Sequence, residues 1–416
     1  MGKTDSPERM RIASRFGTAE ALTIASPPAP TPWINRGAPP RVALIHYWLV
    51  GMRGGEKVLE SLCHMFPQAD IFTHVYAPEK VSDVIRRHKV ITTSIARLPM
   101  ATKLYTKYVS MMPRALEELD LSGYDLVISS ESGPAKGVIP QPEALHLCYV
   151  HSPMRYIWDH YSIYRRNTDP ITRRMMAPLT SNLRTADVTS AARVDGFAAN
   201  SRFVQQRVMK YWRRHSRIIH PPVDVARFRP AANTEVGAFY LYAGELTSYK
   251  RPDLAIDAFN RLGLPLVVIG GPDKCEKALA KKANPNIRFL GRVSDEKLRR
   301  YFAACRALIF PGEEDFGIVP VEVMAAGRPV IAYGKGGALD SVVDGVTGTF
   351  FREQTVDSLV ESVERFEAEG MHKLDSTRIM AHAQGFDESN FRDGMIDFLA
   401  DYGMPVLAPT PLRQTG

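Results

Sequence analysis

Residues 41–66, RVALIHYWLVGMRGGEKVLESLCHMF, contain the pattern that decides the fold class. The run RVALIHYW is apolar and β-branched, which is typical of a buried parallel strand. Glycines follow it, and residues 56–66 then show the apolar spacing of an amphipathic helix. The stretch therefore predicts one strand–loop–helix unit of a doubly wound α/β sheet.

Strand-like runs of the same kind recur along the chain in two series. They span residues 71–77, 125–131, 145–151 and 196–201, and then residues 240–246, 264–271, 287–293, 306–312 and 329–334. A proline-bearing stretch, residues 220–237, separates the two series and is expected to be a linker. We predict an α/β fold with two tandem Rossmann-like domains, residues 41–232 and 233–385, that face a central cleft in which a substrate binds.

Composition excludes several classes of protein. Hydrophobic residues make up 45% and charged residues 24% of the 416, which argues against a disordered, fibrous or integral-membrane chain. The net charge of +8 is too small a bias for dedicated nucleic-acid binding. The four cysteines form no CxxC pair, so neither a zinc site nor a disulfide framework is expected and a reducing cytoplasm is favoured.

The ends and the surface of the chain carry further signals. Residues 1–40 hold six prolines between Pro27 and Pro40 and are expected to be a disordered extension, apart from a short possible helix near residues 10–21. No apolar run approaches the ~20 residues that span a bilayer, and the first residues lack the pattern of a signal peptide. Any membrane contact is therefore expected to be peripheral.

Residues 311–337, PGEEDFGIVPVEVMAAGRPVIAYGKGG, hold the most informative polar pattern. Glu314 falls in a strand-end loop and Glu322 in the following helix, whose first turn suits Pro320. The free amides at this helix start belong to Phe316, Gly317 and Ile318. They are expected to face a phosphate or a sugar hydroxyl, helped by the helix dipole. Taken alone, the spacing of the two glutamates is more typical of a surface loop followed by an ordinary helix glutamate than of a binding site.

The same segment and seven others resemble the retaining glycosyltransferases of the GT-B fold, of the family four, or group 1, type. The seven are RGGEKVLE (53–60), YDLVISSESGPAKGV (124–138), CYVHSPMRYIWD (148–159), AARVDGFAANSRFV (191–204), IIHPPVDVARF (218–228), YKRPDLAIDAFNRLG (249–263) and FLGRVSDEKL (289–298). Within that family the chain is most similar to bacterial mannosyltransferase-like enzymes of lipopolysaccharide or exopolysaccharide assembly. The resemblance implies that the first domain binds the acceptor and the second binds the nucleotide-sugar donor. It also implies that residues 386–405 form a helix that returns to the first domain.

The resemblance implies a role for each matching site residue. Glu322 matches the glutamate that binds the nucleotide ribose, and Glu314 the one that contacts the transferred sugar. The backbone of Phe316 and Gly317 is implied to meet the sugar or the phosphate, and that of Arg292 and Val293 to meet the base.

Further implied roles lie on other loops. Lys250 matches the cation that neutralises the diphosphate leaving group, and His151 matches a histidine near the reacting centre of the sugar. Gly54 and Gly55 match a double-glycine loop that receives the donor phosphate and the acceptor; a plain tight turn is the alternative for these two residues.

Two residues depart from the family pattern. Glu245 stands where the family usually has an arginine beside the diphosphate, so Arg251 or another cation is expected to substitute. Tyr47 stands where subgroup members often carry an acidic residue. For Asn200 and Ser201, which end a strand and start a helix, a cap and a ligand contact are weighed equally.

The implied activity is metal-independent transfer of a hexose with retention of configuration, with GDP-mannose as the donor and a lipid-linked glycan as the acceptor. No Asp-x-Asp pair is present, so no metal or other cofactor is expected. Residues 85–115 hold seven Arg or Lys and no acidic residue, interleaved with apolar ones. This pattern suits either packed, solvated helices or a surface on anionic lipid. The implied partners are the donor, a polyprenyl-diphosphate-linked glycan and the cytoplasmic face of the inner membrane.

Two rival functions remain at this stage. A non-catalytic sugar-nucleotide-binding or scaffold protein would keep the fold, and the departures at Glu245 and Tyr47 favour this alternative. An NAD-dependent oxidoreductase would also suit tandem Rossmann-like sheets, but no G-x-G-x-x-G follows the strands that begin near Arg41 and Tyr240.

Overall fold

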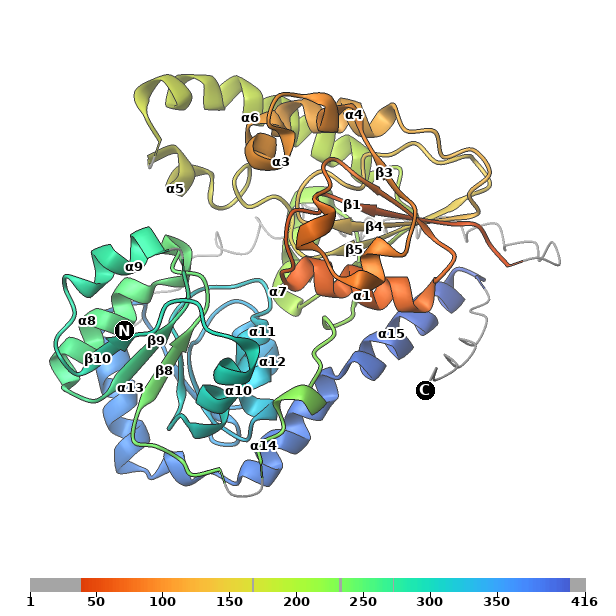
Figure 1. Cartoon of the computed structure of the whole chain (residues 1–416). Coiled ribbons are helices and arrows are strands. Elements are labelled where there is room, and N and C mark those ends of the chain that lie inside the picture. The colour runs from red at the N-terminus through yellow and green to blue at the C-terminus, as the bar shows by residue number, and fades with distance from the viewer. Residues whose placement is uncertain (1–38, 167, 232–233, 272, 405–416) are drawn as a thin grey trace, which may run out of the picture.

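The computed structural model describes residues 39–166, 168–231, 234–271 and 273–404, arranged as two α/β lobes (Figure 1). The residue 1–40 extension, with its possible helix, falls almost wholly outside the described residues, and so does the boundary expected at residues 232–233. Within the described residues, each lobe contains one sheet in which every strand pair is parallel.

The first sheet has seven strands in the order β3-β2-β1-β4-β5-β6-β7. Its strands are β1 (Val42–His46), β2 (Asp70–Thr73), β3 (Val90–Thr92), β4 (Leu126–Glu131), β5 (Leu145–Val150), β6 (Gly196–Ala199) and β7 (Arg217–Ile218). Successive side chains of β1 alternate between two cores: Val42 and Leu44 join one cluster, whereas Ala43 and Ile45 join the other. Because both faces are covered, the strand reads as a continuous apolar run.

The helices of the first lobe cover both faces of this sheet. They are α1 (Gly54–Met65), α2 (Asp83–Arg86), α3 (Ala101–Leu104), α4 (Met112–Glu117), α5 (Tyr161–Arg166), α6 (Pro170–Ala191) and α7 (Arg202–Trp212). Short 3-10 turns include η2 (Ser94–Arg97) and η3 (Tyr105–Met111). The basic stretch 85–115 therefore folds as several short elements, and its apolar side chains pack mainly inward around Ile95 and Met112.

The second sheet has six strands in the order β10-β9-β8-β11-β12-β13. They are β8 (Tyr240–Ala243), β9 (Leu266–Ile269), β10 (Ile287–Phe289), β11 (Leu308–Phe310), β12 (Val330–Tyr333) and β13 (Gly348–Phe351). Counted along the chain, this order is 3-2-1-4-5-6, the doubly wound arrangement in which ligands bind at the carboxyl ends of the strands. The prediction of two tandem Rossmann-like domains is therefore confirmed.

Ten helices or 3-10 turns follow the strands of the second lobe in the described part of the chain and lead back to the first lobe. They are η5 (Ser248–Lys250), α8 (Pro252–Leu262), α9 (Asp273–Ala280), α10 (Asp295–Ala304), α11 (Ile318–Ala325), α12 (Ala338–Ser341), α13 (Val356–Ala368), η6 (Met371–Lys373), α14 (Ser376–Ala383) and η7 (Gln384–Phe386). Strands β3, β7 and β13 were not expected from the sequence. They are short or lie at the sheet edges, where burial imposes no long apolar run.

The last helix, α15 (Glu388–Asp401), leaves the second lobe and runs along the first, beside α1 (Figure 1). Phe391 is buried and packs edge-on against Tyr149 of β5. Met395 and Phe398 join the same core as Val42 of β1. The helix therefore completes the hydrophobic core of the first sheet from the far end of the chain.

Phe391→Ala is expected to lower the free energy of unfolding of the first lobe by about 3–5 kcal/mol, because it removes a buried ring from a packed core. Urea unfolding followed by tryptophan fluorescence measures this change. Asp393→Ala, on an exposed position of the same helix, is the matched control and should change the free energy by less than about 0.5 kcal/mol. Equal effects of the two substitutions would contradict the packing role of α15.

Candidate functional site

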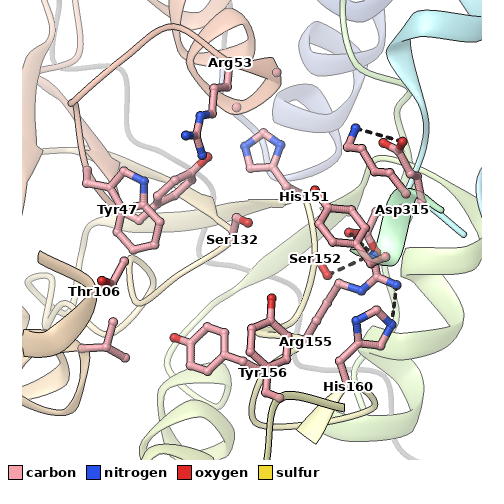
Figure 2. A pocket seen from close by; sticks show the side chains of 18 of the residues that line it. Tyr47, Arg53, Thr106, Ser132, His151, Ser152, Arg155, Tyr156, His160 and Asp315 are labelled. Carbon is pink, nitrogen blue, oxygen red and sulfur yellow. Dashed lines mark hydrogen bonds and ion pairs between the residues drawn. The ribbon is translucent and has the colours of Figure 1, made fainter. Parts of the chain in front are cut away.

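A cavity of about 990 Å³ lies between the two lobes and is lined by residues of both (Figure 2). The first lobe contributes loops that follow β1, β4 and β5, and the second contributes η5 and the loop between β11 and α11. These loops stand at the carboxyl ends of parallel strands, where doubly wound sheets bind their ligands. Nine of the predicted site residues line this cavity: Gly54, Gly55, His151, Lys250, Glu314, Phe316, Gly317, Ile318 and Glu322.

The Glu314–Lys250 ion pair occupies the second-lobe wall of the cavity. Lys250 ends η5, Glu314 follows β11, and Lys250 Nζ donates to Glu314 Oε1 at 2.9 Å. Burial by itself lowers the pKa of Lys250, but Glu314, Tyr249 and Glu245 together outweigh burial, so the net pKa is raised. Lys250 therefore presents a stable positive charge to the cavity at neutral pH.

The double-glycine loop forms the first-lobe wall. A Cβ atom on Gly55 would lie 2.1 Å from the Tyr47 hydroxyl oxygen and 3.6 Å from His151 Nε2, so no other residue fits there. A Cβ atom on Gly54 would lie 3.0 Å from Cδ1 of Ile318, which belongs to the other lobe. The two glycines therefore allow a close approach between the lobes as well as room beside the polar groups.

His151 and Tyr47 are both held uncharged. Burial lowers the pKa of His151 to about 3, with a smaller contribution from nearby His46. Burial, and then the Glu56 carboxylate, raises the pKa of Tyr47 well above its usual value. At neutral pH this wall consequently offers a neutral imidazole and a protonated phenol, both of which serve as hydrogen-bonding groups. Tyr47 supplies no carboxylate to the site.

The start of α11 supplies the remaining predicted groups of this wall. Gly317 is the N-cap with φ 85°, a left-handed conformation that glycine tolerates, and the helix begins at Ile318. Phe316 lines the cavity just before it, and Glu322 lies one turn along the helix. Burial raises the pKa of Glu322 to about 7, although the positive charge of Arg227 lowers it in part. A carboxyl group of this kind is half protonated near neutral pH.

Three predicted residues do not line this cavity: Arg251, Arg292 and Val293. The Arg251 guanidinium pairs with Asp253 at 3.1 Å. The side chain of Arg292 lies beside Gly271, where an added Cβ would be 2.9 Å from its Nε atom. Arg251 is therefore engaged within the second lobe.

The cation nearest the departure at Glu245 comes from the other lobe. Arg53 lines the cavity, and its Nη2 atom lies 3.5 Å from Glu245 Oε1. The backbone N–H of Arg53 donates to Glu56, which fixes the position of the residue at the start of α1. Figure 2 shows Tyr47, Arg53 and His151 grouped on this side of the cavity. Glu245, which stands where the family usually has an arginine, thus faces an arginine of the other lobe.

Asp315, which the sequence analysis did not single out, connects the lobes on the opposite side. Its Oδ1 atom accepts a hydrogen bond from Nη1 of Arg207 at 2.6 Å, and Arg155 lies 3.6 Å from Oδ2. Arg207 is almost fully buried and also donates to Ser152 at 2.6 Å. In the sequence, only its position between Glu314 and Phe316, within residues 311–337, indicates that Asp315 belongs to the site. This cluster holds the 313–316 loop against the first lobe.

Ser201 takes the cap role that the sequence left open, whereas a ligand contact at Asn200 stays a prediction. Ser201 Oγ caps α7 by accepting from the Val204 N–H and donates to the Asp315 carbonyl. The Asn200 side chain lines the cavity and donates to the His151 carbonyl at 3.0 Å. Nearby, Arg202 of α7 pairs with Asp340 of α12 at 2.6 Å. The start of α7 is therefore part of the interface between the lobes.

A branch of the cavity extends into the first lobe between η3 and the helices α5 and α6. Its apolar lining residues are Val109, Tyr156, Tyr164, Met176, Leu179 and Leu183. Polar lining residues of the same branch are Thr106, Lys107, Ser110, His160, Thr168, Thr172 and Thr180. The cavity consequently has a charged part around Lys250 and Glu314, and a part along α6 where apolar and polar side chains mix.

Among the described residues, no group of three or more His, Cys, Asp or Glu side chains is placed to hold a metal ion. In the same part of the chain, no helix is both long enough and apolar enough to cross a membrane.

Comparisons with known proteins identify the class to which this architecture belongs. Residues 52–227 match the family described as Glycosyltransferase Family 4, and residues 226–381 match Glycosyl transferases group 1. The chain belongs to this glycosyltransferase family, as its motifs predicted.

Curated relatives and solved structures agree with this assignment. D-inositol 3-phosphate glycosyltransferase of Mycobacterium marinum is 31% identical over 228 residues, which cover 47% of this chain and 49% of the relative. The homologous enzyme of Streptomyces avermitilis is 32% identical over 160 residues, or 32% of this chain and 34% of the relative. The chain spans about half the length, or less, of the curated relatives it matches.

Two solved structures share the fold at low sequence identity. HepE from Anabaena, in complex with UDP and glucose, has a TM-score of 0.64 at 17% identity, covering 87% of this chain and 99% of its own. Sucrose-phosphate synthase from Thermosynechococcus elongatus has the same TM-score and identity, covering 87% and 98%. These similarities establish the two-domain fold.

Proposed function

We propose that the chain is a metal-independent, retaining glycosyltransferase that moves mannose from GDP-mannose onto a lipid-linked glycan in bacterial exopolysaccharide or lipopolysaccharide synthesis. One observation carries the proposal: Lys250, Glu314, His151 and Glu322 line a single cavity between the lobes, together with the double-glycine loop. Each of these residues matches a family position with a role in sugar transfer, and the family is established. The arrangement supports a donor held between the lobes.

Charge in the cavity supports departure of a nucleoside diphosphate without a metal ion. Lys250 is positive, and Arg53 adds a second cation within the same cavity. The N–H groups at the start of α11 point out of the helix and favour an anion. These groups stabilise the negative charge that develops on the leaving diphosphate. Glu314, already paired with Lys250, is placed to accept hydrogen bonds from sugar hydroxyls.

Retention requires the acceptor to attack the face of the sugar that the diphosphate leaves. In this mechanism the enzyme binds both substrates on the same side of the anomeric carbon and orients them, which lowers the entropic part of the barrier. His151, uncharged at neutral pH, is placed near this point as a hydrogen-bonding group. The Asp315 cluster keeps the 313–316 loop in register with the first lobe.

Two features support a lipid-linked acceptor: the apolar side chains that line the cavity along η3, α5 and α6, and the outer surface of the same three elements. Exposed apolar side chains gather on η3, α5 and α6: Met111, Ile163, Tyr164, Met175 and Leu179. The exposed basic residues Lys103, Arg165 and Arg166 lie on neighbouring elements. Apolar side chains flanked by lysine and arginine are typical of surfaces that rest on anionic lipid. We therefore place the enzyme peripherally on the cytoplasmic face of the inner membrane.

Calorimetric titration with GDP, UDP, ADP and their hexose conjugates, in EDTA, tests the donor. We expect GDP and GDP-mannose to bind, and Glu322→Ala to weaken binding by roughly tenfold or more, because a hydrogen bond to a charged group contributes about 1.5–3 kcal/mol. Glu364→Ala, on the exposed face of α13, is the matched control.

Three other results, two of this titration and one of a turnover assay, would change the proposal. Selective binding of UDP-glucose would replace the proposed donor and leave the class intact. Binding of a donor without turnover on any lipid-linked acceptor would favour the non-catalytic alternative. Loss of binding in EDTA with recovery in Mg²⁺ would contradict metal independence.

The pH dependence of donor binding follows from Glu322. Its pKa in the free protein is raised to about 7, and protonation replaces the charged acceptor of the ribose hydroxyls by a weaker neutral one. Affinity for the nucleotide sugar is therefore expected to be constant above pH 8 and to fall as pH drops below 7, by up to tenfold per unit. Titrations from pH 5.5 to 8.5 measure it, and Glu322→Gln should flatten the profile. An unchanged slope in that variant would assign the titration to another group.

Charge reversal at Lys103, Arg165 and Arg166 is expected to reduce binding to phosphatidylglycerol vesicles, by roughly fivefold for each residue, because each contributes about 1 kcal/mol near an anionic surface. Flotation assays at low ionic strength measure it. Reversal of Lys281, Lys282 and Lys297, exposed on the second lobe, is the matched control and should have little effect. Equal losses in the two triple variants would indicate nonspecific attraction rather than a docking face.

A further inference from the structure

A line of buried polar side chains runs from the start of α1 to the cavity and is not explained by the roles above. Its members are Glu56 on α1, His46 at the end of β1, Ser130 on β4 and His151 after β5. Glu56, His46 and Ser130 are each at most 2% exposed, whereas His151 lines the cavity. Burying polar groups costs free energy unless they form hydrogen bonds with one another. The arrangement of donors and acceptors along this line is therefore restricted.

Ser130 joins the two histidines. Its Oγ atom is 2.7 Å from His151 Nε2 and 3.1 Å from His46 Nδ1. A hydroxyl has one hydrogen to donate, so Ser130 donates to one ring and accepts an N–H hydrogen from the other. The protonation of the His46 ring therefore determines which nitrogen of His151 carries its hydrogen.

Glu56 faces the outer end of this line. Its Oε2 atom accepts the Arg53 backbone N–H at 3.0 Å, while Oε1 lies 3.9 Å from His46 Nε2. His46 Nε2 has no hydrogen-bond partner among the described residues. A carboxylate oxygen attracts an N–H group and repels a ring lone pair, and burial strengthens the difference. The carboxylate consequently favours a hydrogen on His46 Nε2.

We propose that Glu56, His46 and Ser130 are positioning residues that hold His151 in the Nε2–H tautomer. With its hydrogen on Nε2, neutral His46 accepts from Ser130 through Nδ1. Ser130 then accepts from His151 Nε2–H, and His151 Nδ1 keeps its lone pair. The next step rests on the proposed function. The lone pair lets His151 accept a hydrogen bond from a hydroxyl group of the donor sugar or of the acceptor substrate, and makes it a poor partner for phosphate oxygens.

The tautomer is measured by two-bond ¹H–¹⁵N correlation spectra of protein labelled with ¹⁵N in its histidine rings, at pH 7.5. His151 is assigned as the pattern lost in His151→Asn. We expect the Nε2–H pattern for His151 in the unsubstituted chain. The Nδ1–H pattern for His151 would overturn the proposal. It would mean that Ser130 donates to His151 and accepts from His46 Nδ1–H, which also happens when the His46 ring is doubly protonated.

Glu56→Gln tests the direction of the line. The amide oxygen of the new side chain keeps the Arg53 N–H, so its NH₂ group takes the place of Oε1, faces His46 Nε2 and favours a lone pair there. His46 Nδ1–H must then donate to Ser130, and His151 is expected to change to the Nδ1–H tautomer. Glu60→Gln, one turn along α1 where the side chain pairs with Lys57, is the matched control and should leave the pattern unchanged. An unchanged pattern in Glu56→Gln would overturn the role of Glu56.

Ser130→Ala keeps the proposal testable if Glu56→Gln does not fold. Without the hydroxyl, the two tautomers of His151 are expected to exchange, and a single unchanged Nε2–H pattern would overturn the role of Ser130.

The spectra need no substrate, so the positioning of His151 is tested separately from the proposed function. If no donor supports transfer while the tautomers behave as described, the proposed function fails and the positioning of His151 stands. If transfer occurs, Glu56→Gln should lower kcat more than it raises KM.

Discussion

The hydrogen bonds of Asp315 to Arg207 and the neighbouring first-lobe groups are the contacts on which the site depends. They join a loop of the second sheet to the first sheet, next to Glu314 on one side and Phe316 on the other. An almost fully buried guanidinium is stable only when carboxylates and carbonyls satisfy it, and Arg207 finds these in both lobes. Since the loop is fixed from both sides, Lys250 and His151 line the same cavity although 99 residues separate them in the chain.

Three ion pairs around this cavity are already formed before any ligand arrives. Glu314 pairs with Lys250, Arg53 with Glu245, and Asp315 with Arg207. The Arg53–Glu245 pair is largely exposed, so it contributes at most about 1 kcal/mol to stability. A weak ion pair of this kind breaks easily, so Arg53 is free to pair with an anionic ligand instead. In the proposed function, Glu245 positions Arg53 until the ligand binds and does not repel the ligand from the site.

Much of the fold was predictable because its signals are local. A buried parallel strand is largely apolar on both faces, so β1 and β8 appear in the sequence as apolar runs, and β4 and β5 as mainly apolar runs with a few buried polar side chains. The edge strands β3 and β7 carry no such signal and were missed. Arg251 was considered as a substitute cation because it adjoins Lys250. In the structure it turns to Asp253, while the nearest cation to Glu245 comes from the other lobe. The Arg53–Glu245 contact joins residues almost 200 positions apart, and the spacing of residues along the sequence cannot predict such a contact.

The sequence by itself determined the two α/β domains, the family and the candidate residues on strand-end loops, because apolar periodicity and short motifs are properties of neighbouring residues. Only the tertiary structure decided which of those residues share a cavity. It also decided that Tyr47 fills the space left by Gly55, and that His46 and Ser130 connect Glu56 to His151. The physical reason is that parallel strands bring their carboxyl ends together regardless of sequence distance. Hydrogen bonds and charges at those ends are then set by three-dimensional packing.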